Sequence, residues 1–235
     1  MLPTTLVFVF VWTLGAAQEP SSPPPADAFK PEPTWKPLGT DLWFDPQNRT
    51  LVLRTRVALR DGALEHLLCL RNTKEHEAIL ATSATPKLIH AGLLLTGVEP
   101  GHPVRFRPEF QPPEGPPIAI EVEWVENGKT HRAPARDWVK DEQTGRLLDK
   151  DWVFAGSEMV EDPISKKAFY AADEGDLITV ANFPSSILDL PFASSANDAE
   201  RNFVANTPRI PPRGTPVTVY LRPEKANPKS KQAEK

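Results

Sequence analysis

The sequence contains one cysteine in 235 residues, and this scarcity limits the redox and metal chemistry open to the protein. Cys69 alone can form no intramolecular disulfide, and it supplies too few thiolates for a structural zinc site that needs two. An iron-sulfur cluster, which takes four protein ligands that are mostly thiolates, is excluded for the same reason. We therefore expect no cofactor.

Several motifs that mark known chemistry are also missing. The sequence has no GxSxG, no GxxxxGK[ST] and no GxGxxG segment, so hydrolase, nucleotide-binding and dinucleotide-binding templates find no support. The net charge is −4. Residues 222–235 carry five basic and two acidic side chains, so the rest of the chain sums to −7. Because a net acidic body repels phosphates, we expect no nucleic-acid partner.

The chain also lacks an apolar run long enough to cross a membrane. The run from Leu6 to Leu14 is too short for a hydrocarbon core about 30 Å thick, and Gly15, Ala16 and Ala17 follow it. This pattern predicts a signal peptide over 1–17, cleaved near Ala17, and a secreted or periplasmic protein. No Lys or Arg precedes the run, so a buried N-terminal strand is the alternative.

Composition divides the remaining chain into three parts. Residues 18–34 form a proline-rich linker, residues 35–223 a globular domain, and residues 224–235 a basic, disordered tail. No transmembrane segment remains after cleavage of the signal.

Alternating apolar residues predict a strand over Thr50–Arg60, followed by the turn signal Asp61-Gly62. A two-residue turn there would pair this strand with the segment 63–70 and set Arg54 opposite Cys69. A second strand over 118–124 ends at Asn127-Gly128, which predicts another hairpin.

A helix is predicted over 85–97. Thr85 suits its N-cap, Pro86 its first position and Gly97 the residue just past its end. The helix has almost no polar face, so we expect it to be buried. With 27 prolines and several short strands, the sequence favours an α+β fold: a mainly antiparallel sheet, one buried helix at about 85–97, and long Pro-rich loops.

One cluster of side chains suggests acid-base chemistry or ligand binding. Glu75, His76 and Glu77 are adjacent, and His90 lies in the predicted helix. Two imidazoles and a carboxylate can hold a divalent metal, but the spacing matches no known metal motif, so no metal site is assigned. A hydrogen-bonded structural histidine is the alternative.

Two further features have both a chemical and a structural interpretation. If Cys69 faces Arg54, the cation would lower the thiol pKa and make it reactive; otherwise Cys69 is a small core residue. Arg54, Arg56 and Arg60 share one face of their strand, where they either receive an anionic ligand or form a solvated surface.

The order of several segments resembles the YdjY domain family of exported bacterial proteins. The segments span roughly residues 35–223 and are KEHEAIL (74–80), PKLIHAGLLLTGVEP (86–100), DWVFAGS (151–157), YAADEGD (170–176), NFP (182–184) and LDLP (188–191). The resemblance implies export from a bacterial cell. Of a histidine-containing family motif, this chain matches His76 and Glu77, with His90 in the adjoining helix.

The sequence thus favours a non-enzymatic binding or structural domain at the cell envelope, with an unknown protein or small ligand as its partner and no catalytic residues assigned. The alternative is a metal-dependent hydrolase that uses His76, Glu77 and His90. These two functions differ in geometry, because the hydrolase needs both imidazoles to converge on one ion.

Overall fold

The structure is a computed structural model that describes residues 29–191 and 203–224. The predicted signal peptide, most of the linker and the tail beyond residue 224 lie outside the described residues. The linker residues from Phe29 to Thr34 contain neither helix nor strand.

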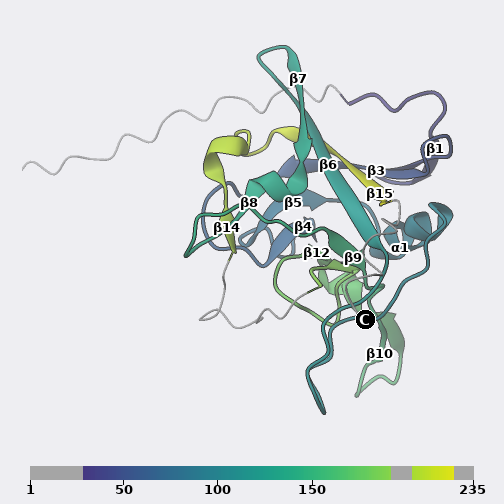
Figure 1. The fold of residues 1–235 in the computed structure, drawn as a ribbon. Helices are drawn as coiled ribbons and strands as arrows, with labels where there is room; N and C mark the ends of the chain where they lie inside the picture. The colour runs from purple at the N-terminus through teal and green to yellow at the C-terminus, as the bar shows by residue number, and fades with distance from the viewer. Residues whose placement is uncertain (1–28, 192–202, 225–235) are drawn as a thin grey trace, which may run out of the picture.

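Most of the regular secondary structure in the described chain is short strands (Figure 1). The strands are β1 (Lys36–Gly39), β2 (Leu42–Asp45), β3 (Thr50–Val57), β4 (His66–Leu70), β5 (Ala78–Thr82), β6 (Pro117–Glu126), β7 (Lys129–Pro134), β8 (Val139–Asp141), β9 (Trp152–Phe154), β10 (Met159–Glu161), β11 (Ala168–Tyr170), β12 (Asp176–Thr179), β13 (Leu188–Asp189), β14 (Phe203–Ala205) and β15 (Pro216–Pro223). The helices are α1 (Pro86–Leu95) and the short 3₁₀ helices η1 (Ala135–Trp138), η2 (Ala171–Glu174) and η4 (Thr207–Arg209).

Eight strands close into a barrel, in the order β3-β15-β6-β9-β13-β12-β4-β5. The barrel closes where β5 pairs with β3, through Arg56 opposite Ala81 and Val57 opposite Leu80. The β12–β13 and β4–β5 pairs are parallel and the other pairs are antiparallel, so the sheet is mixed. The predicted α+β fold with a mainly antiparallel sheet is therefore wrong: the described residues are 42% strand and 11% helix.

The hairpin predicted at Asp61-Gly62 is also wrong. β3 ends at Val57, and β5 lies between β3 and β4 in the barrel. Cys69 pairs with Ala81 on one side and Asp176 on the other, so it does not face Arg54. The predicted alternation is present in β3, where Arg54 and Arg56 are less buried than Thr55 and Val57, but local sequence does not determine which strand becomes the neighbour.

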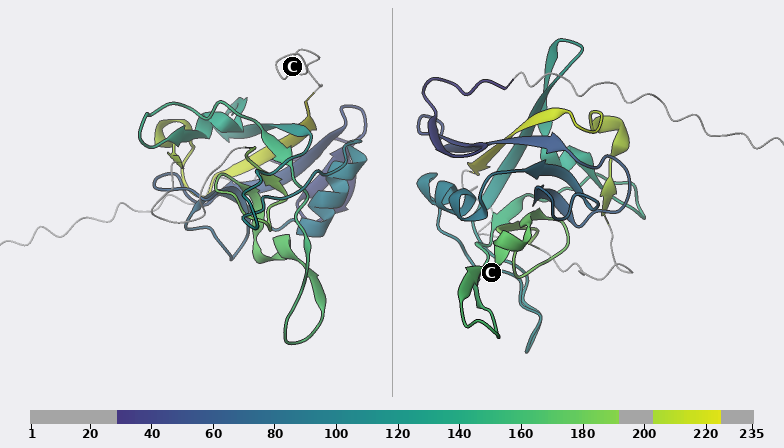
Figure 2. Two further views of the ribbon diagram at one scale, coloured as in Figure 1. Left: turned by 60° about the horizontal axis from the view of Figure 1, so that its bottom comes forward. Right: turned by 180° about the vertical axis from the view of Figure 1, so that it is seen from behind.

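Elements that depend on local signals agree better with prediction. β6 and β7 form the expected hairpin, with Asn127 at φ 51° and Gly128 at φ 72° in the turn. Helix α1 follows Thr85 and ends before Gly97, which has φ 88°. The helix is only partly buried, however, because it packs one face on β1, β2 and β3 and leaves Leu94 and Leu95 exposed (Figure 2).

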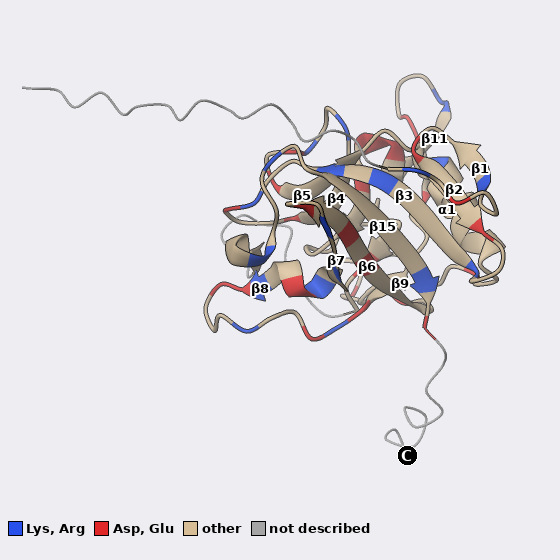
Figure 3. Ribbon diagram, turned by 90° about the horizontal axis from the view of Figure 1, so that it is seen from above, with Lys and Arg blue, Asp and Glu red and all other residues tan. Residues whose placement is uncertain are grey.

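The barrel interior and the buried face of α1 form one apolar core. Its largest fully buried side chains include Trp138, Trp152 and Phe154. Charged residues are spread over the loops and strands (Figure 3), and one of their ion pairs joins Arg132 of β7 to Glu121 of β6 at 2.9 Å. Among the described residues, no helix has the length and apolar character to cross a membrane.

Candidate functional site

The structure separates the histidines that the sequence singled out. His76 lies in the turn before β5, and its side chain is 76% exposed and 3.6 Å from the carboxylate of Glu77. Glu75 lies in the same turn, and no described contact joins either residue to His90. The described residues contain one group of three side chains close enough to hold a metal ion, and it consists of Glu65, His66 and Glu77. Of the predicted residues, only Glu77 belongs to it.

His90 has a structural environment on α1. Its Nδ1 lies 3.0 Å from the carbonyl oxygen of Gly156 and 2.9 Å from the hydroxyl of Tyr170. Because the carbonyl can only accept, Nδ1 carries the hydrogen and donates it. Burial lowers the pKa of His90, which favours the neutral ring. The ring also packs edge-on against Phe154. His90 thus anchors α1 to the loop after β9.

Cys69 is a free cysteine with no exposed surface. Burial raises the pKa of its thiol to about 12. Its neighbours in the packing are Ala58, Ala78 and Ala81. This environment is that of a small core residue and disfavours a thiolate.

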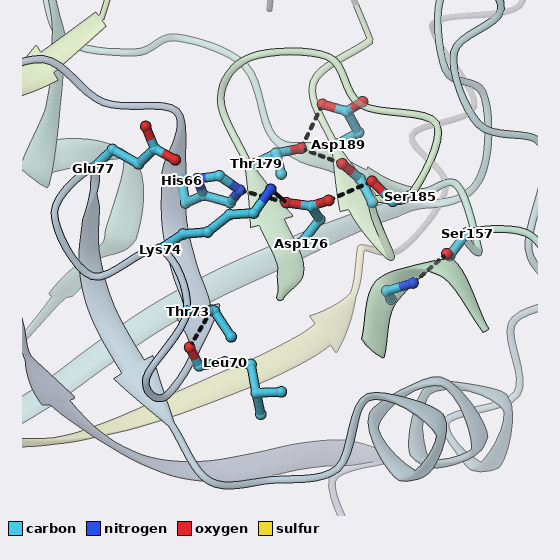
Figure 4. Close-up of polar contacts among 12 residues, drawn as sticks. His66, Leu70, Thr73, Lys74, Glu77, Ser157, Asp176, Thr179, Ser185 and Asp189 are labelled. Atoms are coloured by element: carbon cyan, nitrogen blue, oxygen red, sulfur yellow. Dashed lines mark hydrogen bonds and ion pairs between the residues drawn. The ribbon is translucent and has the colours of Figure 1, made fainter. Parts of the chain in front are cut away.

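A polar cluster that the sequence did not reveal lies between β4 and β12. Asp176 Oδ1 lies 2.8 Å from Nε2 of His66 and 2.7 Å from Nζ of Lys74, and the hydroxyl of Ser185 donates to Oδ2. Figure 4 shows these three side chains directed at the one carboxylate. Phe183 stacks on the imidazole of His66, with 5.4 Å between ring centroids. We call these residues the Asp176 cluster.

The electrostatics of the Asp176 cluster follow from these contacts. Burial alone would raise the pKa of Asp176, but the hydrogen bonds from His66, Lys74 and Ser185 outweigh burial and hold this pKa well below its usual range. Because Nε2 of His66 donates to Asp176, only the other ring nitrogen, Nδ1, is left to contact a further group. That atom is buried and has no hydrogen-bond partner. Figure 4 places Glu77 on the side of the imidazole away from Asp176.

A second buried carboxylate lies near the Asp176 cluster. Asp189 Oδ1 accepts hydrogen bonds from Thr179 Oγ1 at 2.9 Å, Asn182 Nδ2 at 3.0 Å and the backbone N–H of Leu190 at 2.8 Å. Its other oxygen has no partner. Burial raises the pKa of Asp189 to about 8, so the group holds its proton at neutral pH.

Three residues that each have an unsatisfied buried N–H group line a cavity of about 470 Å³ beside the β6–β7 hairpin. We call this cavity the tryptophan pocket. Its lining residues are Arg60, Trp124, Glu126, His131, Ala133, Trp138 and the segment 208–212. Among the described residues five buried side-chain polar atoms lack a partner, and three of them belong to this lining: Arg60 Nε, Trp124 Nε1 and Trp138 Nε1.

Backbone and side-chain contacts fix the walls of the tryptophan pocket. Trp124 and His131 are paired across β6 and β7, and their rings stack with 5.3 Å between centroids. Trp138 ends η1, which is tied to the segment before η4 by the hydrogen bond from Asn206 N to the Trp138 carbonyl, 2.8 Å long. Arg209 pairs with Asp137 at 2.5 Å across the same junction.

Without hydrogen-bond partners, these three N–H groups lower the stability of the fold. A buried N–H group without an acceptor costs about 1–3 kcal/mol, and here three residues that line one cavity have such a group. Trp152 shows the usual arrangement, since its indole N–H donates to the carbonyl of Thr179 at 2.7 Å. The sequence marked Arg60 as a possible anion receiver, but no spacing rule would place it beside Trp124 and Trp138, which come from distant segments.

Comparison with known proteins identifies the domain. The family model of the YdjY domain matches residues 42–222, which span β2 to β15. Searches of curated proteins and of solved structures each gave no match. The chain belongs to the YdjY domain family.

Proposed function

We propose that the protein is an exported, non-enzymatic binding protein of the cell envelope, whose ligand occupies the tryptophan pocket. The observation that carries this proposal is that three residues lining one cavity each have a buried N–H group without a partner. Cavities of several hundred Å³ with apolar walls and a few polar groups are typical of small-molecule sites. Export is supported by the apolar run Leu6–Leu14 and the small residues after it.

The described contacts favour binding over catalysis. A serine nucleophile needs a base strong enough to take its proton, but the hydroxyl of Ser185 donates to Asp176, whose lowered pKa makes that carboxylate a weak base. His66 has no exposed surface, so a substrate would have no access to its ring. His76 and His90, on which the hydrolase alternative depends, have separate sets of partners.

Indole N–H signals in an ¹⁵N-labelled sample provide a direct test of binding. The sequence has six tryptophans, and Trp12 lies in the predicted signal, so the mature chain should show five indole signals. Trp124→Phe and Trp138→Phe assign two of them. We expect some members of a panel of small acids, amides, amines and sugars to move both assigned signals saturably. If no compound at millimolar concentration moves either signal, binding at this pocket is refuted.

Export is tested separately by expressing the full chain in a bacterial host. We expect the protein in the periplasm or medium, with a mature N-terminus at Gln18 in its mass spectrum. Retention of an uncleaved chain in the cytoplasm would contradict the proposal.

A second candidate function, divalent-cation binding, is favoured by one observation. The buried Nδ1 of His66 has no partner, and one ligand atom each of Glu65, His66 and Glu77 lie within 4.8 Å of one another. Asp176 holds the opposite nitrogen, an arrangement that orients metal-ligating histidines in many proteins. Both glutamates also make other contacts, with which an ion would compete.

Cation binding predicts a concentration-dependent rise of the unfolding temperature with Zn²⁺ or Mn²⁺. Glu77→Gln should abolish this rise, whereas Glu75→Gln, the matched change in the neighbouring turn, should leave it intact. An equal response in both variants would show that the ions bind elsewhere.

A further inference from the structure

We propose that one end of the barrel docks on the anionic surface of a lipid bilayer, with apolar side chains at the tips of two projecting arms inserted among the lipid headgroups. This proposal concerns a different part of the molecule from the tryptophan pocket and does not depend on ligand binding there. Three observations carry it. Two arms leave the barrel at one point, their tips expose large apolar side chains beside basic ones, and the described chain ends at the same point, before a lysine-rich stretch of sequence.

Both arms start at the end of β9. The backbone of Phe154, the last residue of β9, is hydrogen-bonded to both ends of the first arm, residues 101–116, at 3.0 Å each. The second arm, residues 158–171, follows β9 directly and consists of the paired strands β10 and β11 with their turn. Both arms extend downward from the barrel in Figure 1 and in the right-hand view of Figure 2. Their tips therefore lie at one end of the molecule.

The first arm has an ordered backbone. Two isolated backbone pairings join its two sides, the outer one between Arg105 and Gln111. Four prolines restrict the chain further, namely Pro103, Pro108, Pro112 and Pro113. An arm that is ordered before it binds loses little conformational entropy on contact with a partner.

The tips of the arms expose large apolar side chains. Ile164 lies in the turn between β10 and β11, and at 92% it is the most exposed of the large apolar side chains in the described residues. Phe106 and Phe110, in the tip of the first arm, are 46% and 43% exposed, and their ring centroids lie 5.9 Å apart. Apolar groups held in water in this way gain free energy when an apolar environment covers them.

The separation of the two tips favours a bilayer over a protein partner. A stable protein interface needs a continuous, complementary surface of about 1,000 Å² or more. Here the exposed apolar groups of the arms belong to short segments on two separate projections. The interfacial region of a bilayer is fluid, and its affinity for a protein grows with the apolar area inserted and with the attraction of basic groups to anionic lipids.

Basic side chains stand beside both apolar tips. Arg105 and Arg107 flank Phe106 in sequence, and Lys166 and Lys167 closely follow Ile164. All four basic residues are exposed. Long Arg and Lys side chains next to an inserted apolar group can reach lipid phosphates, to which Arg forms strong charge-assisted hydrogen bonds.

Acidic side chains at the tips offset much of this charge. They are Glu109, Glu161 and Asp162, so residues 105–111 and 161–167 together hold four basic and three acidic side chains, a net charge of +1. The arms alone therefore attract an anionic surface only weakly, and a further source of positive charge is needed.

The end of the described chain supplies this further charge. Glu224, its last residue, donates its backbone N–H to the carbonyl of Pro117 at 3.0 Å, directly after the first arm. Residues 222–235 hold five basic and two acidic side chains, a net charge of +3. The positive charge of the C-terminal sequence thus begins at the base of the arms. Lys and Arg near an anionic lipid surface add an attraction that salt weakens.

Sedimentation with lipid vesicles tests the proposal on the mature chain, residues 18–235. We expect binding to vesicles of equal parts phosphatidylglycerol and phosphatidylcholine, and binding at least about tenfold weaker to vesicles of phosphatidylcholine alone. Phe106→Ser combined with Ile164→Ser should weaken binding to the anionic vesicles by at least about tenfold. Val125→Ser combined with Leu147→Ser is the matched control, because these exposed apolar side chains lie outside both arms, and it should leave binding unchanged.

Each other result of these measurements would overturn the proposal. Absence of binding to both kinds of vesicle would refute it. Equal binding to both kinds would show that anionic lipid has no part, and an equal loss in the two double variants would show that the arms do not make the contact. Deletion of 225–235 should weaken binding to the anionic vesicles by about tenfold, and an unchanged affinity would contradict the role given to that sequence.

A second copy of the chain is the competing partner for the arms. Sedimentation velocity without vesicles should show a monomer. A dimer that dissociates when Phe106 and Ile164 are both replaced by serine would assign the arms to a protein interface and overturn docking on lipid. Because none of these measurements involves the tryptophan pocket, their results leave the proposed binding function untouched.

Discussion

Replacing Asp189 by asparagine should remove a pH dependence of stability that the fold imposes. In the unfolded chain this carboxyl loses its proton near its ordinary pKa of 3.8, whereas burial in the fold raises the pKa to about 8. Between these values the folded state holds a proton that the unfolded state has lost. The free energy of unfolding therefore falls as the pH rises through this window.

The magnitude follows from the same shift. Each pH unit inside the window changes the free energy of unfolding by about 1.4 kcal/mol, and the full window by on the order of 6 kcal/mol as an upper limit. An asparagine at this position would stay neutral throughout while keeping the oxygen that accepts from Thr179, Asn182 and Leu190. Asp189→Asn should therefore gain stability relative to the wild type as the pH rises.

Urea unfolding of both proteins at several pH values between about 4 and 8 measures this difference. Asp141→Asn is a suitable control, because Asp141 is exposed and hydrogen bonds from Thr144 lower its pKa, so its variant should show a constant difference over the upper part of the window. If the curves of wild type and Asp189→Asn run parallel from low to high pH, Asp189 is ionised in the fold and the reasoning is refuted.

Three further predictions concern the framework of the barrel. Asp176→Asn should destabilise the protein by about 3 kcal/mol in urea unfolding, because it removes the negative charge that the buried partners of Asp176 contact. Asp173→Asn, at the surface, should cost less than about 1 kcal/mol. Equal effects of the two substitutions would contradict the assigned role of the Asp176 cluster. Cys69 should resist iodoacetamide in the native protein at neutral pH and react fully in denaturant; rapid native labelling would disprove its burial. Gly115→Ala should lower the free energy of unfolding by about 1–3 kcal/mol, because the new Cβ would overlap with the carbonyl oxygen of Phe154; an unchanged urea midpoint would show that this contact relaxes freely.

The sequence predicts the parts of this fold that depend on neighbouring residues. The Asn127-Gly128 turn joins strands that pair directly, and α1 begins and ends at its capping signals. Asp61-Gly62 carries an equally strong turn signal, but the chain continues past it and a later strand, β5, takes the place beside β3. Barrel closure depends on pairing between strands that lie far apart in the sequence, and no local sequence pattern encodes this pairing.

In the candidate sites, too, local sequence indicates some residues, whereas others become recognisable only in the folded structure. Glu77 was identified because it stands beside a histidine, whereas His66 appears in sequence as one polar residue inside an apolar strand. Its partner Asp176 follows 110 positions later. In the tryptophan pocket, Arg60 was recognisable as a charge on a strand face. Trp124 and Trp138, which line the same cavity, come from segments far from Arg60 in the sequence, and no local pattern links them to it.

The position of β15 between β3 and β6 has a consequence for how the molecule is made. This strand pairs along its length with both neighbours, from Val217 opposite Trp124 to Leu221 opposite Leu51, yet it is the last strand to be synthesised among those described. A nascent chain that has not reached Pro216 lacks the strand that joins the two sides of the cylinder, so its apolar faces stay unpaired. The barrel therefore cannot close until β15 has been synthesised, so its closure depends on contacts between segments that are far apart in the sequence.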